Sequence, residues 1–453
     1  MRTLDVDDND KMDLVDDVDN VDFANTYRHC PNLAARGHLS TFVGLVYVII
    51  LIMAAVCAGA EDTFKIHPKW FQVGPNPSAI VAPDLNGDGL PEIVTASRGA
   101  LRDPRQEQPA NNEVTFLVAG PGLDYVTQTP LRADFAPYAI AVGNVDALKA
   151  LDLVVASFLA VQHRDLALFL NMGNNLFESH YFAVPQEALV YKRMLDGNNE
   201  PVFTKPGLTS LALADVNHDG LLDVIATGWS SDVLAFFPGK ADGYFGAPVL
   251  IDAAGGPCDV KAVDLDGDKN LDLAVVFYCS NEIGIWKGDG KGNFTPATRF
   301  GTRGRLPNKV QVSDINKDGK LDLVVSHCYT EDSLVIFYGD GGLGFSLSQE
   351  ILLGADRDVL ECEIRDLVVA DFNGDGRPDL AAACYGSGEV VVLINTSEGE
   401  ALPQTFKREK YVFENGKPRA LCAADFNKDG RTDLGVALWD ANAVALLLNK
   451  PPK

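Results

Sequence analysis

The chain is 453 residues long, 47% of its residues are hydrophobic, and 63 acidic against 38 basic side chains give a formal net charge of −25. This length could hold several domains. The acidic balance, with no basic stripe in the sequence, argues against a nucleic-acid partner.

The N-terminal segment indicates export. Residues 1–41 form an acidic leader with nine Asp, which we expect to be disordered. Residues 42–60 are the longest apolar run and end in Ala58-Gly-Ala60, small residues of the kind found at signal-peptide cleavage sites. Basic residues precede this run and acidic residues follow it, which directs the rest of the chain out of the cytoplasm. Two alternatives stay open for this segment, a cleaved signal peptide or a membrane anchor, so we expect an extracellular or periplasmic protein, secreted or anchored.

From residue 84 onward, one nine-residue acidic pattern recurs. Carboxylate or amide side chains stand at positions 1, 3, 5 and 9, and position 6 is usually Gly. Six good copies begin at Asp84, Asp215, Asp264, Asp314, Asp371 and Asp425. Ca²⁺ takes six to eight oxygen ligands at about 2.3–2.6 Å, and the pattern contains neither sulfur nor clustered His, so it favours Ca²⁺ over Zn²⁺ or Cu²⁺. The sequence therefore predicts about six calcium sites.

In each good copy, positions 1, 3, 5 and 9 would contribute side-chain oxygens and position 7 its backbone carbonyl. The predicted ligands are Asp84, Asn86, Asp88, Leu90, Glu92, Asp215, Asn217, Asp219, Leu221, Asp223, Asp264, Asp266, Asp268, Asn270, Asp272, Asp314, Asn316, Asp318, Lys320, Asp322, Asp371, Asn373, Asp375, Arg377, Asp379, Asp425, Asn427, Asp429, Arg431 and Asp433. Gly at position 6 permits the sharp turn. If the decayed copy at residues 144–152 is counted as the second, Lys269 replaces this Gly in the fourth copy, the one that begins at Asp264, and we expect strain there. A decayed second copy, residues 144–152, has Leu148 and Lys149 at positions 5 and 6 and is expected to be a plain turn.

Short apolar runs flank every loop and predict strands. Leu211-Ala-Leu213 precedes the third loop, Val224-Ile225 follows it, and Val233–Phe236 supplies a further strand. A Gly-rich turn and an aromatic residue then open a fourth strand, and the loops start 49 to 71 residues apart. Four antiparallel strands in each of seven repeats predict an all-β, seven-bladed β-propeller over residues 61–453. Residues 64–73 would supply the missing fourth strand of the last blade and close the ring.

These loops resemble those of FG-GAP/VCBS-repeat proteins, the family that includes the integrin α-subunit propeller. The resemblance covers roughly residues 62–450 and implies the same fold, with calcium at the matching loops. It leaves the function open, because these repeats occur in adhesins, lectins, assembly factors and enzyme accessory domains.

A ligand would bind on the face opposite the acidic loops, which carries the two longest insertions, residues 98–113 and about 187–205. Most copies have an aromatic residue six positions after position 9, and we expect these to surround the central channel. The candidate ligand-binding residues are Arg98, Phe158, Trp229, Tyr278, Tyr329, Tyr385 and Trp439. The alternative is that they pack between blades as core.

The sequence favours a binding or adhesion module for a protein or glycan, without catalysis. It contains no His-Glu-x-x-His, Gly-x-Ser-x-Gly or phosphate-loop motif. One alternative is a polysaccharide lyase with its base among Arg98, Arg102, Tyr191, Lys192 and Arg193. A second is an anchored structural or assembly factor.

The cysteines suggest two disulfides in an oxidising compartment. Cys258 and Cys279 flank the fourth loop in an antiparallel hairpin, and Cys328 and Cys362 could join adjacent blades. The alternative is that these are buried thiols.

Overall fold

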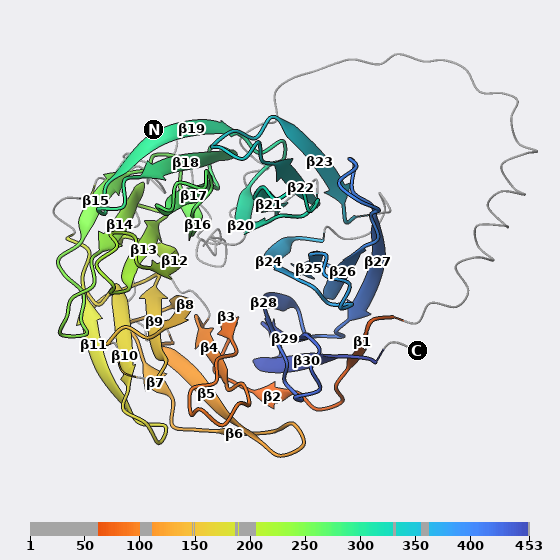
Figure 1. Ribbon diagram of the computed structural model, residues 1–453. Coiled ribbons are helices and arrows are strands. Elements are labelled where there is room, and N and C mark those ends of the chain that lie inside the picture. The colour runs from red at the N-terminus through yellow and green to blue at the C-terminus, as the bar shows by residue number, and fades with distance from the viewer. Residues whose placement is uncertain are drawn as a thin grey trace, which may run out of the picture. The chain divides into compact units, whose positions relative to one another are not determined.

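In the computed structural model, the residues described are 62–99, 111–146, 148, 150–185, 189, 205–328, 332–354 and 362–451. Their regular structure is entirely β, arranged in seven antiparallel sheets. Figure 1 shows these sheets placed radially around a central opening within the unit Phe64–Lys453, which confirms the predicted seven-bladed propeller. No helix in this part of the chain is long and apolar enough to cross a membrane. The leader and the apolar run at 42–60 lie outside the described residues.

The strands of each blade are given in order from the central channel outward. The first blade consists of β3 (Pro77–Val81), β4 (Ile93–Ser97), β5 (Glu113–Gly120) and β6 (Asp124–Thr127), and β7 (Leu131–Arg132) also pairs with β5. The second blade consists of β8 (Pro137–Gly143), β9 (Asp152–Ser157), β10 (Leu166–Asn171) and β11 (Phe177–Phe182). The third blade consists of β12 (Leu208–Ala214), β13 (Asp223–Gly228), β14 (Val233–Phe237) and β15 (Val249–Asp252).

Blades four to six follow the same order. They are β16 (Pro257–Val263), β17 (Asp272–Phe277), β18 (Glu282–Gly288) and β19 (Phe294–Gly301); β20 (Pro307–Ser313), β21 (Asp322–His327), β22 (Ser333–Tyr338) and β23 (Leu347–Leu352); and β24 (Ile364–Ala370), β25 (Asp379–Cys384), β26 (Glu389–Asn395) and β27 (Phe406–Val412).

The seventh blade joins the two ends of the ring. Its strands are β28 (Pro418–Ala424), β29 (Asp433–Leu438), β30 (Ala443–Asn449) and β1 (Phe64–Ile66), and β2 (Phe71–Gln72) also pairs with β30. The antiparallel register places Phe64 opposite Asn449 and Ile66 opposite Leu447. An N-terminal strand therefore completes the last blade, as the sequence predicts.

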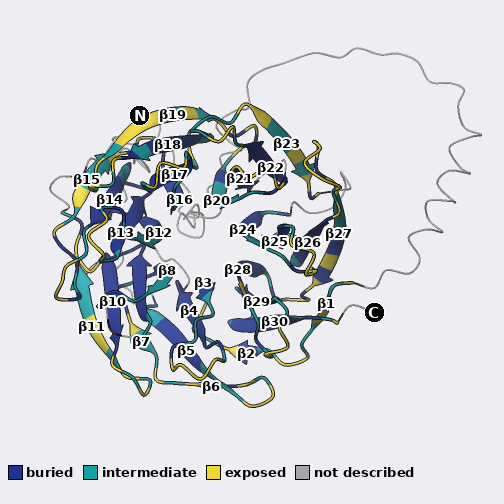
Figure 2. Ribbon diagram, viewed as in Figure 1, coloured by how far each residue is buried: buried dark blue, intermediate teal, exposed yellow. Residues whose placement is uncertain are grey.

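The core lies between neighbouring blades. Every residue of the second strands β4, β9, β13, β17, β21, β25 and β29 is buried. Ile225 and Phe236 of the third blade pack in one cluster with Val275 and Trp286 of the fourth. Figure 2 shows exposed residues concentrated on the outer strands and turns. Each blade thus buries both faces of its middle strands, which fixes the loops at its ends.

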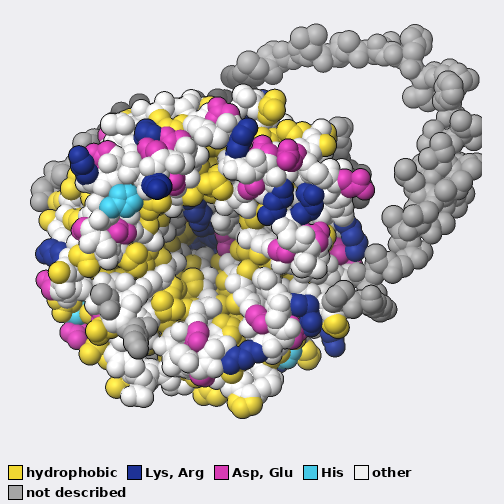
Figure 3. Space-filling view, in the orientation of Figure 1, with side chains coloured by type: hydrophobic (Ala, Val, Ile, Leu, Met, Phe, Trp, Pro, Cys, Tyr) yellow, Lys and Arg dark blue, Asp and Glu magenta, His cyan; other side chains and the backbone are white. Residues whose placement is uncertain are grey.

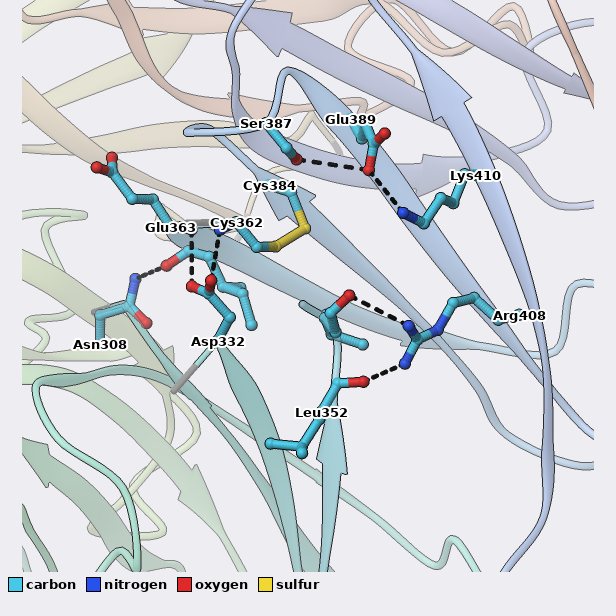
Figure 4. Close-up of a disulfide and its surroundings, with 12 residues drawn as sticks. Asn308, Asp332, Leu352, Cys362, Glu363, Cys384, Ser387, Glu389, Arg408 and Lys410 are labelled. Carbon is cyan, nitrogen blue, oxygen red and sulfur yellow. Dashed lines mark hydrogen bonds and ion pairs between the residues drawn. A yellow bond between two sulfur atoms is a disulfide. The ribbon is translucent and has the colours of Figure 1, made fainter. Parts of the chain in front are cut away.

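Both predicted disulfides are wrong. The bond joins Cys362, two residues before β24, to Cys384, the last residue of β25, beside Asp332 (Figure 4). Strand pairing sets Ile364 opposite Cys384, so these two cysteines meet across a hairpin. Cys258 is a buried free thiol, because the register of β16 shifts at this residue and its Sγ donates to the Pro307 carbonyl of the next blade (3.3 Å).

Candidate metal loops and the opposite face

The acidic loops connect the first and second strands, and their side-chain oxygens fold back over the loop amides. In the third loop, Asp215 accepts hydrogen bonds from the amides of Asp219 (3.1 Å) and Gly220 (3.0 Å). Asn217 accepts a second bond from the Asp219 amide (2.9 Å), and Asp219 accepts one from the Leu221 amide (2.9 Å). Equivalent bonds form in the loops beginning at Asp84, Asp264, Asp314, Asp371 and Asp425. The turn therefore gathers the oxygens of positions 1, 3 and 5.

Position 6 requires a left-handed backbone conformation. Gly220 has φ +85°, and Lys269, the residue that replaces Gly in the fourth loop, has φ +74°. A residue with a Cβ is disfavoured there by on the order of 1 kcal/mol. The expected strain at Lys269 thus has a backbone basis.

Position 9 has a role that the sequence does not reveal. Asp223 is fully buried; its Oδ2 accepts from the Val216 amide (3.1 Å) and its Oδ1 from the amide of Gly239 (2.7 Å), beyond the third strand. One carboxylate therefore fastens the loop to two strands. The same pair of bonds occurs at Asp152, Asp272, Asp322, Asp379 and Asp433.

Burial also makes these carboxyls unusually hard to ionise. Desolvation raises the pKa of Asp379 to about 7 and that of Asp322 to about 6, although backbone hydrogen bonds oppose the shift. It likewise raises the pKa of Glu92, which closes the first loop by accepting from the Leu85 amide (2.7 Å).

The donor set fits a hard divalent cation. In the fourth loop, Asp264, Asp266 and Asp268 each bring a carboxylate oxygen within 4.8 Å of the others. Two oxygens that share one Ca²⁺ at about 2.3–2.6 Å lie at most about 5 Å apart. All side-chain donors are carboxylate or amide oxygens, the ligands Ca²⁺ prefers.

Among its described residues, the decayed second loop keeps several of the hydrogen bonds of the other loops but lacks one oxygen. Asp146 at position 3 still accepts from the Leu148 amide (2.9 Å), and Asp152 still makes both position-9 bonds. Position 5 is Leu148, an exposed aliphatic side chain. Position 9 is thus retained where the cation-binding pattern is incomplete.

On the opposite face, two of the predicted aromatics are buried between blades. Phe158 and Trp229 are 1% and 8% exposed, and their ring centroids lie 6.2 Å apart. Phe158 also packs against Tyr138 at 5.7 Å. These contacts join the second and third blades and favour the core alternative for both residues.

Arg98 and Trp439 are in contact where the first blade meets the seventh. The Arg98 guanidinium lies 4.7 Å from the Trp439 ring centroid and 5.9 Å from that of Tyr138. Arg419 lies over the same two rings and donates a hydrogen bond to the Tyr138 hydroxyl (2.7 Å). Neither Tyr138 nor Arg419 was predicted from the sequence. Each follows directly after the Pro that begins the innermost strand of its blade, and this common position is the feature by which they could have been found.

The remaining candidates are partly exposed or lie outside the described residues. Tyr278, Tyr385 and Trp439 are half-buried, and Lys417 Nζ lies 5.5 Å from the Tyr385 ring centroid. Tyr329 is not among the described residues. Of the suggested lyase bases, Arg98 is only 3% exposed, and the other four, Arg102, Tyr191, Lys192 and Arg193, are also outside the described residues.

The channel wall is polar on one side. Asp259 in β16 is 1% exposed and accepts from Ser210 Oγ (2.6 Å) and the Val310 amide (2.9 Å), with Lys309 Nζ at 3.7 Å. Burial acts to raise the pKa of Asp259, but Lys261 and Lys309, together with the hydrogen bonds from Ser210 and Val310, outweigh it and leave that pKa below its ordinary value. Figure 3 shows Lys and Arg atoms deep in the central opening and hydrophobic side chains along the facing wall.

Four stretches of the chain match the family profile of the FG-GAP-like repeat: residues 215–275, 264–325, 314–382 and 371–436. Each match begins at position 1 of an acidic loop and ends in the second strand of the next blade.

Similar solved structures are distant in sequence. BBS1N in complex with ARL6DN is 13% identical over 87% of this chain and 99% of that chain, with a TM-score of 0.57. Virginiamycin B lyase from Staphylococcus aureus is 12% identical over 85% of this chain and 99% of that chain, with a TM-score of 0.53. Such identities show a shared fold alone. The comparison with curated proteins found no match.

Proposed function

Because this chain is an FG-GAP-repeat β-propeller, we propose that it is an exported, calcium-stabilised binding module that holds a protein or glycan partner on the face opposite its acidic loops. The observation that carries this proposal is the acidic loop, repeated with the same backbone bonds in six blades. In this proposal the loops stabilise the ring and the other face provides recognition. The role is not catalytic.

Calcium is supported by the donor chemistry of the loops. Positions 1, 3 and 5 converge, and position 7 would add its backbone carbonyl. A bound cation would also offset part of the formal charge of −25, since the seven loops hold 21 acidic side chains. Low calcium in the cytosol would leave such loops empty, which supports a location outside it.

A partner on the opposite face is supported by partly exposed aromatics beside cations. Tyr385 beside Lys417 offers flat apolar surface next to positive charge, which suits a protein or glycan partner. Trp439 adds a second partly exposed ring, which packs on the buried Arg98. BBS1N, which shares the fold, was crystallised in a complex with ARL6DN, and this gives weight to a protein partner.

The test is ligand binding with and without calcium. The full chain is screened on a glycan array and against extracellular proteins, in millimolar Ca²⁺ and in EDTA. Trp439→Ala should stay folded and lose the ligand, whereas Leu176→Ala, an exposed side chain after the third strand of the second blade, should keep it. Equal binding by wild type and Trp439→Ala would overturn the assignment of this face, and unsaturated sugar products would indicate a lyase.

A further inference from the structure

The fourth acidic loop differs from the other five good copies. It alone has Asp at position 3, Asp266, where the others have Asn. It therefore carries four carboxylates, including Asp264, Asp268 and Asp272, against three in each of the others. It also has Lys269 in place of the turn glycine.

A lysine from outside the loop lies on two of these carboxylates. Lys287, in the third strand β18, places its Nζ 2.9 Å from Asp268 Oδ2 and in direct contact with Asp266 Oδ2. The Lys287 side chain is 41% exposed, and its ammonium bridges positions 3 and 5 of the loop near the end of β18. These are two of the oxygens that a calcium ion in this loop would use.

Among the described residues, no other blade has Lys or Arg at the equivalent place, which in the first blade is Val118. Lys287 directly precedes Gly288, whose amide binds the position-9 carboxylate of Asp272 (3.0 Å). In the five other blades with this bond, the preceding residues are Leu170, Pro238, Tyr338, Ile394 and Leu448. The additional acid, Asp266, and the additional base, Lys287, thus occur in the same blade and touch each other.

We propose that Lys287 is a built-in counter-ion of the fourth loop, which holds the loop together without calcium and makes it the weakest calcium site of the six. Calcium must displace the ammonium from Asp266 and Asp268 before it can use their oxygens. The last loop also has a cation on position 5, because Arg431 contacts Asp429, but that cation reaches one carboxylate whereas Lys287 reaches two. We therefore expect the other five loops to fill before the fourth. This inference rests on the proposed calcium sites and deepens them, since it separates five structural ions from one exchangeable ion.

The experiment measures calcium binding by titration calorimetry on the full chain stripped of metal. Lys287→Met keeps the length of the side chain and removes its charge. We expect it to tighten the weakest site by about tenfold or more, because a unit charge a few ångströms from a divalent ion weakens binding by at least that factor. Lys291→Met, an exposed lysine in the following turn of the same blade, makes the same change in net charge and should leave the affinities unchanged.

Thermal unfolding in EDTA provides the second readout. Without calcium, Lys287→Met should melt at a lower temperature than Lys291→Met, because Asp264, Asp266 and Asp268 are left without their counter-ion. The double variant Lys287→Met/Asp266→Asn restores the composition of the other loops and should recover stability.

The outcomes separate this inference from the proposed function. If wild type binds calcium but Lys287→Met matches Lys291→Met in affinity and in EDTA stability, Lys287 is not a counter-ion and the calcium proposal stands. If neither wild type nor Lys287→Met binds millimolar calcium, both proposals fail.

Discussion

The buried carboxylate at position 9 shows how one residue can be fixed by requirements other than metal binding. Asp152 belongs to the loop without a position-5 oxygen, yet it accepts the Val145 and Asn171 amides, both at 2.8 Å. A buried amide left without an acceptor costs about 1–3 kcal/mol. This carboxylate therefore stabilises the second blade whether or not any cation is present.

We predict that Asp152→Asn destabilises the protein by about 1–3 kcal/mol, because the side-chain NH₂ would face a backbone donor. Denaturant unfolding in EDTA measures the change. The exposed Asp242→Asn of the next blade is the control and should have no effect. An unchanged midpoint for Asp152→Asn would show that the bonds to Val145 and Asn171 contribute little.

The buried His327 should make the stability of the protein depend on pH. Its ring is fully buried, with Nδ1 3.2 Å from the Ser333 carbonyl, and burial lowers its pKa from 6.5 to about 4. The unfolded chain therefore takes up the proton first. The stability that depends on neutral His327 is complete above about pH 6.5 and is lost as the pH falls towards 4, by about 3 kcal/mol in total.

We expect His327→Gln to flatten the fall in unfolding free energy between pH 7 and pH 4.5. The exposed His163→Gln should retain the wild-type slope. Identical slopes for all three proteins would rule out His327 as the group responsible.

At the scale of the element, strand order and ring closure could be predicted, and contacts between distant strands could not. The spacing of Asp and Gly, with an apolar run on each side, placed the loops and the strands around them. The bond from Arg419 to Tyr138 joins residues 281 apart in sequence, and only the closed ring brings them together. The disulfide could not be predicted, because the register of β16 skips Cys258 and because Cys362, two residues before β24, lies against the end of β25 and not against the next blade.

The closing strand β1 can be tested through Phe64. This side chain is 1% exposed, its ring lies 5.3 Å from that of Phe372, and its amide donates to the Tyr411 hydroxyl (2.9 Å). We predict that Phe64→Ala costs about 3–5 kcal/mol, as removing a buried Phe usually does. Lys65→Ala, on the exposed side of the same strand, should change little. If both variants unfold at the same denaturant concentration, β1 does not anchor the seventh blade.

For the whole molecule, charge is distributed unevenly. The acidic loops lie at one end of the blades, whereas Lys261 and Lys309 lie on the inner strands beside the buried Asp259. Repulsion among the loops opposes closure of the ring unless cations offset it. The sequence showed the acidic repeat; it could not show that inner strands of neighbouring blades bring these lysines to one wall.

Calcium binding should therefore determine the stability of the ring. An ion that binds only the folded state adds about 2.7 kcal/mol per site at 100 times its Kd. The most direct measurement is thermal unfolding of the full chain in millimolar Ca²⁺, in the same concentration of Mg²⁺, and in EDTA at matched ionic strength. Our account predicts a melting temperature many degrees higher in Ca²⁺ than in either of the others. Superimposable curves in Ca²⁺ and EDTA would contradict it.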